Sequence, residues 1–437
     1  MPLTPAARYA GVGFSRGGSD LAALKSNRAL LIEAEPEQLG FDSRRLARID
    51  HHFRRYVDDG RLPGWQLLVS RQGIIAHLSE YGLRDKEAVA PIERDTIFRI
   101  YSMTKPITSV AAMMLYEEGA FELSTPVSRF IPSFKEARVY IRGSSQKPYT
   151  EPAAEPIRIW HLLTHTAGLT YGFHHAHACD EAYRSAGYEW SSPPGVDLAA
   201  ACDTWARLPL MFHPGTEWNY SVATDVLGRV IELVSGQTLD RFLAERIFEP
   251  LGMVDTGFHV PEQEQGRLAA LYALGPGADQ PVRFDLLGHL ALKPPDMLSG
   301  GGGLVSTIAD YHRFAQMLLR RGELGGNRLL AGRTLDYMSQ NHLPGGLDLE
   351  AVGRPLFAET TFHGVGFGLG LSVLMDPVAN KTLGSPGEIA WGGAASTAFW
   401  VDRKEEVIVV FMTQLLPSSS HPIRSELRQL VYQALLD

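Results

Sequence analysis

Four consecutive residues, Ser102-Met103-Thr104-Lys105, have the types and the spacing for nucleophilic catalysis. They stand at the head of an apolar run, residues 106–116, whose pattern predicts a helix. Positions three apart on a helix share one face, so the Lys105 amine would lie beside the Ser102 hydroxyl. A serine hydroxyl is a weak nucleophile at neutral pH and needs a neighbouring base or cation. The tetrad therefore predicts acyl transfer through Ser102, although the same spacing also occurs at ordinary helix starts.

The bulk composition limits the classes of protein to which the chain can belong. Its 437 residues are 45% hydrophobic, which is enough for a large core and suggests two structural units. The net charge is −8, from 41 basic and 49 acidic residues without a long block of one sign, so nothing indicates nucleic-acid binding. Two cysteines, Cys179 and Cys202, make no disulfide framework. The N-terminus lacks a signal-peptide pattern, and no uncharged apolar run reaches the roughly 18 residues of a membrane span, so we expect a cytoplasmic protein.

The catalytic tetrad must be positioned by elements that differ along the chain. Near both ends the pattern predicts short strands, at residues 66–70, 73–78, 367–375, 396–401 and 406–412. Helices are predicted after the Asp42 cap (43–59), through the middle (157–163, 224–235, 237–247) and at the end of the chain (424–436).

Strands at both ends with helices between predict an α/β fold of the α+β type. Its central antiparallel sheet would be formed by the N- and C-terminal parts and flanked by helices. We expect a sheet domain from residues 1–104 and 291–437, and a mostly helical insertion domain at 105–290. The active site would lie in the cleft between them.

Four further segments accompany the tetrad. Residues 161–169 end a helix at Gly168, 214–222 deliver Tyr220 before a helix, 299–310 are a Gly-rich loop, and 391–394 precede a strand. Together with the tetrad they resemble the serine β-lactamase and penicillin-binding-protein superfamily, over roughly residues 40–435. The pattern is most similar to the class C-like branch that includes the family VIII carboxylesterases and related acyltransferases.

The resemblance implies a role for each matching residue. Ser102 would be the acyl-accepting nucleophile, with Lys105 against it. Tyr220 matches the first position of the family's Tyr-x-Asn motif and would share proton transfer with Lys105, without the sequence deciding which takes the serine proton. The backbone N–H groups of Ser102 and Ala394 would form the oxyanion hole.

Two departures from the family pattern concern the substrate. The family's Lys-Thr-Gly motif falls at Trp391-Gly392-Gly393, so a neutral indole replaces the lysine that attracts a β-lactam carboxylate. The two glycines would let the strand approach the substrate closely. Val222 replaces the asparagine of Tyr-x-Asn, which removes a hydrogen-bonding amide. Trp391, Gly392, Gly393 and Val222 are therefore expected to bind uncharged substrates, unless Trp391 and Val222 only pack beside the site.

Other motifs offer competing sites. Gly13-x-Ser15-x-Gly17 fits a nucleophile elbow, but it lacks the buried strand before it and the helix after it. His174, His175, His177, Cys179 and Asp180 have metal-ligand types without a tetrahedral spacing, and we expect a polar loop. His161 and His165 lack the glutamate of a zinc motif, and glycines 300–303 are not followed by the Lys-Ser/Thr of a phosphate loop.

The sequence thus predicts a serine carboxylesterase that hydrolyses short-chain esters through an acyl-enzyme on Ser102, with weak or no β-lactamase activity. Its partner would be a small-molecule ester, with no cofactor, metal, nucleic acid or membrane involved. An acyltransferase, a β-lactamase or a D-amino peptidase of the same fold would use the same residues. A penicillin-sensing protein without catalysis is the alternative of another class.

Overall fold

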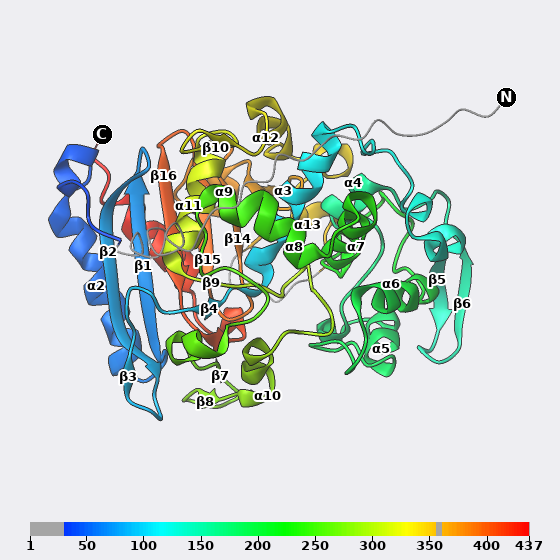
Figure 1. Ribbon diagram of the computed structural model, residues 1–437, viewed down its shortest axis with the longest axis horizontal. Helices are drawn as coiled ribbons and strands as arrows, with labels where there is room; N and C mark the ends of the chain where they lie inside the picture. Colours follow the sequence, from blue (N-terminus) through cyan, green and yellow to red (C-terminus); the bar gives the residue numbers. More distant parts are fainter. Residues whose placement is uncertain (1–29, 355–360, 437) are drawn as a thin grey trace.

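An eight-stranded antiparallel sheet is the centre of the molecule in the computed structural model, which describes residues 30–354 and 361–436 (Figure 1). The strand order is β12-β13-β14-β15-β16-β1-β2-β3. In chain order these strands are β1 (Gly64–Arg71), β2 (Ile74–Asp85), β3 (Ala90–Pro91), β12 (Val365–Phe367), β13 (Ser372–Leu374), β14 (Ile389–Gly392), β15 (Ala398–Asp402) and β16 (Val407–Met412). Because β1 pairs with β16, segments more than 300 residues apart share one sheet. The predicted fold class is confirmed.

Helices cover both faces of this sheet, which explains the uninterrupted apolar run of β16. Its alternate residues Val407, Val409 and Phe411 pack with the apolar faces of α2 (Ser43–Asp58) and α15 (Ile423–Tyr432). The other residues of β16, Ile408, Val410 and Met412, face the opposite side and pack in the main core, which includes α3 (Thr104–Glu117) and α11 (Ile308–Leu319). Figure 1 shows α2 and α11 on opposite sides of the sheet. A strand buried on both faces shows no polar alternation.

The helices begin and end at the signals that the sequence carries. Asp42 caps α2, accepting a hydrogen bond from the Arg45 N–H at 3.0 Å. Helix α7 (Ala223–Ser235) ends at Gly236, whose φ of 72° is left-handed. The other helices are α4 (Ile159–Leu163), α5 (Ala178–Ser185), α6 (Leu198–Arg207), α8 (Leu239–Leu243), α9 (Glu249–Leu251), α10 (Asp285–Gly288), α12 (Gly332–Met338), α13 (Leu349–Val352) and α14 (Pro377–Asn380). A π-helical turn at Ala244–Phe248 joins α8 to α9.

Short strand pairs complete the fold outside the main sheet. They are β4 (Phe98–Arg99) with β9 (Val305–Ser306), β5 (Arg138–Gly143) with β6 (Pro148–Pro152), β10 (Glu323–Leu324) with β11 (Asn327–Arg328), and β7 (Tyr272–Ala273) between β8 (Val282–Arg283) and β17 (Leu415–Leu416). The β5–β6 hairpin lies within the segment predicted to be mostly helical. The division into domains at residues 104/105 and 290/291 stays a prediction.

The sequence prediction of one strand over residues 367–375 was wrong, because this segment turns back on itself. β12 ends at Phe367 and pairs with β13, which begins at Ser372. Gly370 in the turn has φ of 94°, and a Cβ there would collide with the Ser109 side chain of α3. The close approach of α3 therefore requires glycine at this turn.

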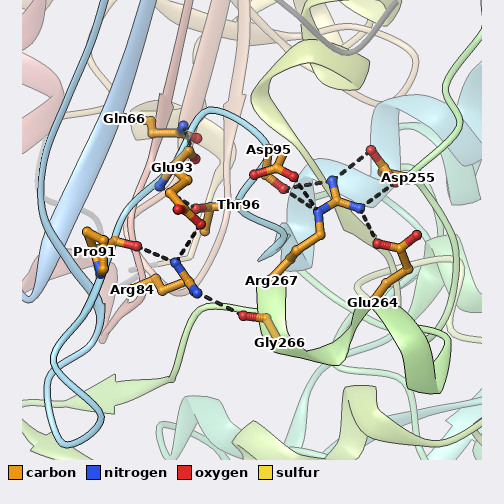
Figure 2. Close-up of polar contacts among 10 residues, drawn as sticks. All are labelled: Gln66, Arg84, Pro91, Glu93, Asp95, Thr96, Asp255, Glu264, Gly266 and Arg267. Carbon is orange, nitrogen blue, oxygen red and sulfur yellow. Dashed lines mark hydrogen bonds and ion pairs between the residues drawn. The ribbon is translucent and has the colours of Figure 1, made fainter. Parts of the chain in front are cut away.

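Two arginines anchor the loop that leads toward Ser102 (Figure 2). Arg267 pairs with Asp255 at 2.9 Å, with Glu264 at 3.0 Å and with Asp95 at 3.0 Å. Arg84 donates to the Gly266 carbonyl at 3.0 Å. Because Asp95 lies just before β4, these contacts tie the approach to the Ser102–Lys105 tetrad to a segment about 170 residues away.

A span through a bilayer requires a long apolar helix, and none of the helices in residues 30–354 and 361–436 meets that requirement.

Candidate active site

Ser102 lies where a short 3₁₀ turn, Tyr101–Met103, passes into α3. Tyr101 has φ of 43°, a left-handed conformation that is uncommon for a residue with a side chain. This turn separates β4 from α3 and leaves Ser102 partly exposed, whereas Lys105 in the first turn of α3 is 1% exposed. The Lys105 Nζ lies 3.5 Å from the Ser102 Oγ. The structure thus brings together the two residues that the tetrad predicted.

The Lys105 amino group is held from several sides. Its Nζ donates to the Gly301 carbonyl at 2.7 Å and to the Tyr171 hydroxyl at 3.0 Å. It also lies 4.3 Å from the centroid of the Tyr220 ring, within the range of a cation–π contact. A carbonyl dipole and aromatic faces compensate a buried ammonium for the water it has lost. The lysine is therefore fixed beside the serine rather than free to swing away.

Tyr171 is a site residue that the sequence interpretation missed. Its hydroxyl is bonded to Lys105, and burial raises the pKa of the Tyr171 phenol well above its ordinary value, with the Asp225 and Tyr220 charges adding to the shift. The phenol is consequently protonated at neutral pH. The signal that could have revealed it is its place two residues after the 161–169 motif.

Tyr220 contacts the site through its ring and through Trp391. The Tyr220 side chain is 5% exposed, and its hydroxyl accepts a hydrogen bond from the Trp391 Nε1 at 3.4 Å. The two ring centroids are 5.5 Å apart. Within the described residues, the Tyr220 hydroxyl makes no hydrogen bond with Ser102 or Lys105. Tyr220 therefore lies in contact with Lys105, but its role in proton transfer stays a prediction.

A buried carboxylate on α7 supports the lysine indirectly, and the sequence interpretation missed it as well. Asp225 accepts hydrogen bonds from the Ser299 hydroxyl at 2.5 Å and from the Gly301 N–H at 3.0 Å. A Cβ at Gly301 would lie 2.6 Å from the Asp225 Oδ2 and 2.9 Å from the Tyr171 hydroxyl, so only glycine fits there. Burial raises the pKa of the Asp225 carboxyl, and the Lys105 charge opposes that rise. The Gly-rich loop thus links an acid and a lysine that do not touch.

The end of β14 leaves a free backbone edge near the serine. β14 pairs with β15 as far as Gly392, but its pairing with β13 stops at Ala390. A Cβ at Gly393 would lie 2.5 Å from the Ile100 carbonyl, so a glycine lets this strand end approach the chain just before Ser102. Ala394 follows in the turn and packs in one apolar cluster with Tyr101.

Val222, one of the predicted substrate contacts, lies in the core. Its side chain is 4% exposed and packs with Ala223 and Val226 in the main core, at the start of α7. Ser102, Lys105, Tyr220 and Trp391 form a continuous set of contacts, and Gly393 and Ala394 lie beside the turn that carries Ser102.

The competing motifs have other surroundings. The Ser15 motif lies outside the described residues. His175 pairs with Glu189 at 3.0 Å, and the His177 Nδ1 accepts from the Cys179 N–H at 3.1 Å, capping α5. In the part of the chain that the structure describes, no three His, Cys, Asp or Glu side chains are grouped to hold a metal ion.

The two histidines of the 161–169 segment are buried and neutral. Burial lowers the pKa of His161 to about 3 and the pKa of His165 well below its ordinary value, with the Lys105 charge adding to the second shift. The His165 ring lies 5.0 Å from the Tyr220 ring. His165 therefore packs behind the site as an uncharged ring.

Comparisons with known proteins agree with this geometry. Residues 49–433 match the family described as beta-lactamase. Protein Rv1367c of Mycobacterium tuberculosis is 36% identical over 371 residues, which cover 84% of this chain and 89% of that protein. Esterase EstB of Burkholderia gladioli is 32% identical, over 91% of this chain and 98% of its own length.

Among solved structures, EstCE1, a hydrolase with promiscuous acyltransferase activity, has a TM-score of 0.75 and 28% identity, covering 89% of this chain and 99% of its own. Fold, site geometry and relatives therefore agree, and this chain belongs to the beta-lactamase family as a serine hydrolase or acyl-transferring enzyme.

Proposed function

We propose that this protein is a serine carboxylesterase that forms its acyl-enzyme on Ser102. The observation that carries the proposal is the 3.5 Å approach of the buried Lys105 amine to the Ser102 hydroxyl. It gives the serine the neighbouring group that it needs to act as a nucleophile. The likeness to esterase EstB supports ester hydrolysis in particular.

In acylation, the Ser102 Oγ attacks the ester carbonyl carbon and its proton passes to the Lys105–Tyr220 pair, which has first released one proton and so presents a neutral amine beside a phenol, or a phenolate beside an ammonium. The carbonyl oxygen becomes an oxyanion that the Ser102 and Ala394 N–H groups stabilise. The Ala394 N–H makes no other hydrogen bond within the described residues, which leaves it available. The bond to the alcohol oxygen then breaks, and the alcohol leaves with the proton. Water repeats these steps on the acyl-enzyme and releases the acid.

The substrate in this proposal is an uncharged ester with an apolar group. Trp391 presents an indole where a lysine would attract a carboxylate, and its Nε1 is already bonded to Tyr220. Tyr171, Phe173 and Trp190 continue the aromatic surface as a stack, with successive ring centroids 4.6 Å apart. Trp190 at its outer end is 48% exposed. Such a surface suits acyl or alcohol groups that are flat and apolar.

The test is hydrolysis of p-nitrophenyl acetate by the wild type, Ser102→Ala and Ser109→Ala. Ser109 is a buried serine on α3, the helix that follows Ser102, so it is a matched control. We expect Ser102→Ala to lower kcat by at least about 10³-fold, because the nucleophile is lost, and to prevent labelling by a fluorescent phosphonate. Ser109→Ala should retain the wild-type kcat and the labelling by the phosphonate. Full activity in Ser102→Ala would disprove the assignment, and a native chain that resists the phosphonate would favour the non-catalytic sensor.

Acyl transfer to an alcohol is a second candidate, and the likeness to EstCE1 favours it. The acyl-enzyme would be the same, with an alcohol in place of water. Adding a short alcohol to the ester assay should divert part of the product to a new ester, measured by chromatography. A chromogenic cephalosporin in the same panel tests the β-lactamase alternative, and rapid turnover of it would contradict the role proposed for Trp391.

A further inference from the structure

A cavity of about 300 Å³ lies against the outer face of the sheet, behind the strand that ends at the candidate oxyanion hole. Gly392, Ala398 and Trp400 line it from β14 and β15, and Arg424 and Arg428 line it from α15. Trp400 packs with the apolar faces of α2 and α15, whereas Lys105 belongs to α3 on the other side of the sheet. Trp391 also lines the cavity, but Ser102, Lys105 and Tyr220 do not, so the cavity lies beneath the strand rather than at the serine.

Arg424 crosses from α15 to the turn that carries Ala394. Its Nη2 donates to the Gly393 carbonyl at 3.1 Å and to the Thr397 carbonyl at 3.2 Å. The Gly393 N–H donates to the same Thr397 carbonyl at 2.9 Å, which closes the turn. One guanidinium therefore bridges both ends of the turn 393–397.

The glycine at position 392 is explained by this arginine. A Cβ there would lie 2.5 Å from the Arg424 Cζ and 2.8 Å from its Nε. Any side chain at 392 would push the guanidinium away from the Gly393 carbonyl. Gly392 therefore leaves room for the Arg424 guanidinium, in addition to its predicted role in substrate binding.

The Gly393 carbonyl and the Ala394 N–H belong to one peptide unit. A cation hydrogen-bonded to the oxygen of an amide draws electron density from its nitrogen, which makes the N–H a stronger donor. We propose that Arg424 is a positioning residue for oxyanion stabilisation: it holds and polarises the Gly393–Ala394 peptide from behind the sheet. This inference rests on the proposed function, since it requires the Ala394 N–H to be the oxyanion donor.

The experiment compares Arg424→Ala, Arg424→Gln and Arg424→Lys with wild type in hydrolysis of p-nitrophenyl acetate. We expect kcat to fall about 10- to 100-fold in Arg424→Ala, less than for loss of an oxyanion donor itself, with KM changed by less than about 3-fold. Arg424→Gln keeps an N–H donor without the charge, and Arg424→Lys keeps the charge without the planar set of N–H donors. The kcat of both variants should therefore lie between those of the wild type and Arg424→Ala. Lys381→Ala is the matched control, because Lys381 is an exposed cation lining the same cavity.

Two readouts separate this role from a purely structural one. Guanidinium chloride at a few tens of millimolar should restore part of the kcat of Arg424→Ala, because the cavity can admit the ion. The affinity for a trifluoromethyl ketone, which forms an oxyanion on the serine, should fall in parallel with kcat, while the affinity for an uncharged amide inhibitor stays unchanged. Thermal melting of each variant checks that it is folded.

The proposal is overturned if a folded Arg424→Ala keeps wild-type kcat, or loses activity without losing affinity for the ketone. If Arg424→Ala does not fold, the same criteria apply to Arg424→Gln. Failure of the proposed function looks different, because Ser102→Ala would then retain activity. With Ser102 confirmed and Arg424→Ala unchanged, only the inference on Arg424 fails.

Discussion

Two tyrosine side chains flank Lys105 in this site, and their surroundings predict different effects on catalysis. The Tyr171 hydroxyl accepts directly from Lys105, whereas the Tyr220 hydroxyl accepts from Trp391 and presents its ring to the lysine. Burial raises the pKa of Tyr171, so its phenolate is costly to form. Tyr171 is therefore suited to fix the lysine, and Tyr220 is the better candidate for the proton relay.

Replacement of each phenol by phenylalanine tests this division of roles. Tyr220→Phe should lower kcat about 10²- to 10³-fold if Tyr220 moves the proton, since general acid–base catalysis contributes on that scale. Tyr171→Phe should cost about 10-fold, the value of one hydrogen bond to a charged group. Single-turnover acylation, followed by release of p-nitrophenol, measures both. The reverse order of effects would transfer the relay to Tyr171.

At the residue scale, the sequence could predict what local geometry controls. Ser102 and Lys105 are three positions apart, so helical spacing alone brings their side chains together. Other contacts of the lysine are tertiary. The Tyr171 hydroxyl and the Gly301 carbonyl bond to Lys105 directly, and Asp225 bonds to the loop that carries Gly301. No spacing in the chain reveals such contacts. The placement of Val222 also depends on packing, because the start of α7 turns its side chain into the core.

At the scale of elements, α7 and the Gly-rich loop act as one support for α3. Asp225 of α7 binds the loop, and the loop presents the Gly301 carbonyl to Lys105. An amide in place of the carboxylate would keep the size of the side chain and remove its charge. The loop would lose a charged acceptor for two donors.

We therefore expect Asp225→Asn to lower kcat about 10-fold, with a smaller change in KM, because the lysine is less firmly held. Steady-state kinetics with p-nitrophenyl acetate measures the change. Asp240→Asn on α8 is the control, because Asp240 is an exposed acid in the first turn of its helix. Wild-type kcat in a folded Asp225→Asn would show that the loop keeps its position without the charge.

The hairpin at β12 and β13 shows where pattern reading fails for elements. Alternation continues through residues 367–375, so the sequence favours one strand. The turn is imposed by α3, whose Ser109 leaves room only for glycine at 370. The strands β15 and β16 were predictable because the turn between them is polar and local.

At the scale of the whole molecule, the sheet joins both ends of the chain around the helical middle. The pairing of β1 with β16 could be expected from strands at the two ends with helices between them. The anchoring of the loop before β4 by Arg267 could not, because Asp95 lies 172 residues away from Arg267 in the chain. The position of Ser102 depends on both.

A buried acid beside this anchor makes the stability of the molecule depend on pH. Asp310 in the first turn of α11 accepts from the Asp255 N–H at 2.7 Å and from the Thr256 hydroxyl at 2.9 Å. Burial raises the pKa of Asp310 to about 7, and the Asp255 charge adds to the shift while these hydrogen bonds oppose it. In an unfolded chain the same carboxyl titrates near pH 4.

Between about pH 4 and 7 the folded protein therefore holds a proton that the unfolded chain has released. The free energy of unfolding falls with rising pH wherever the folded state binds more protons. The stabilisation from the Asp310 proton is therefore complete below about pH 4 and is lost as the pH rises through about 7. Its upper limit is about 4 kcal/mol, because the pKa of Asp310 is about 7 in the folded protein and about 4 in the unfolded chain. Asp310→Asn removes the titrating group and keeps an acceptor for Asp255. Urea unfolding at pH 4.5, 6 and 8 should show the wild type losing stability relative to Asp310→Asn as the pH rises, whereas Asp240→Asn should follow the wild type. Parallel curves for Asp310→Asn and the wild type would mean that Asp310 is ionised throughout this range in the folded protein.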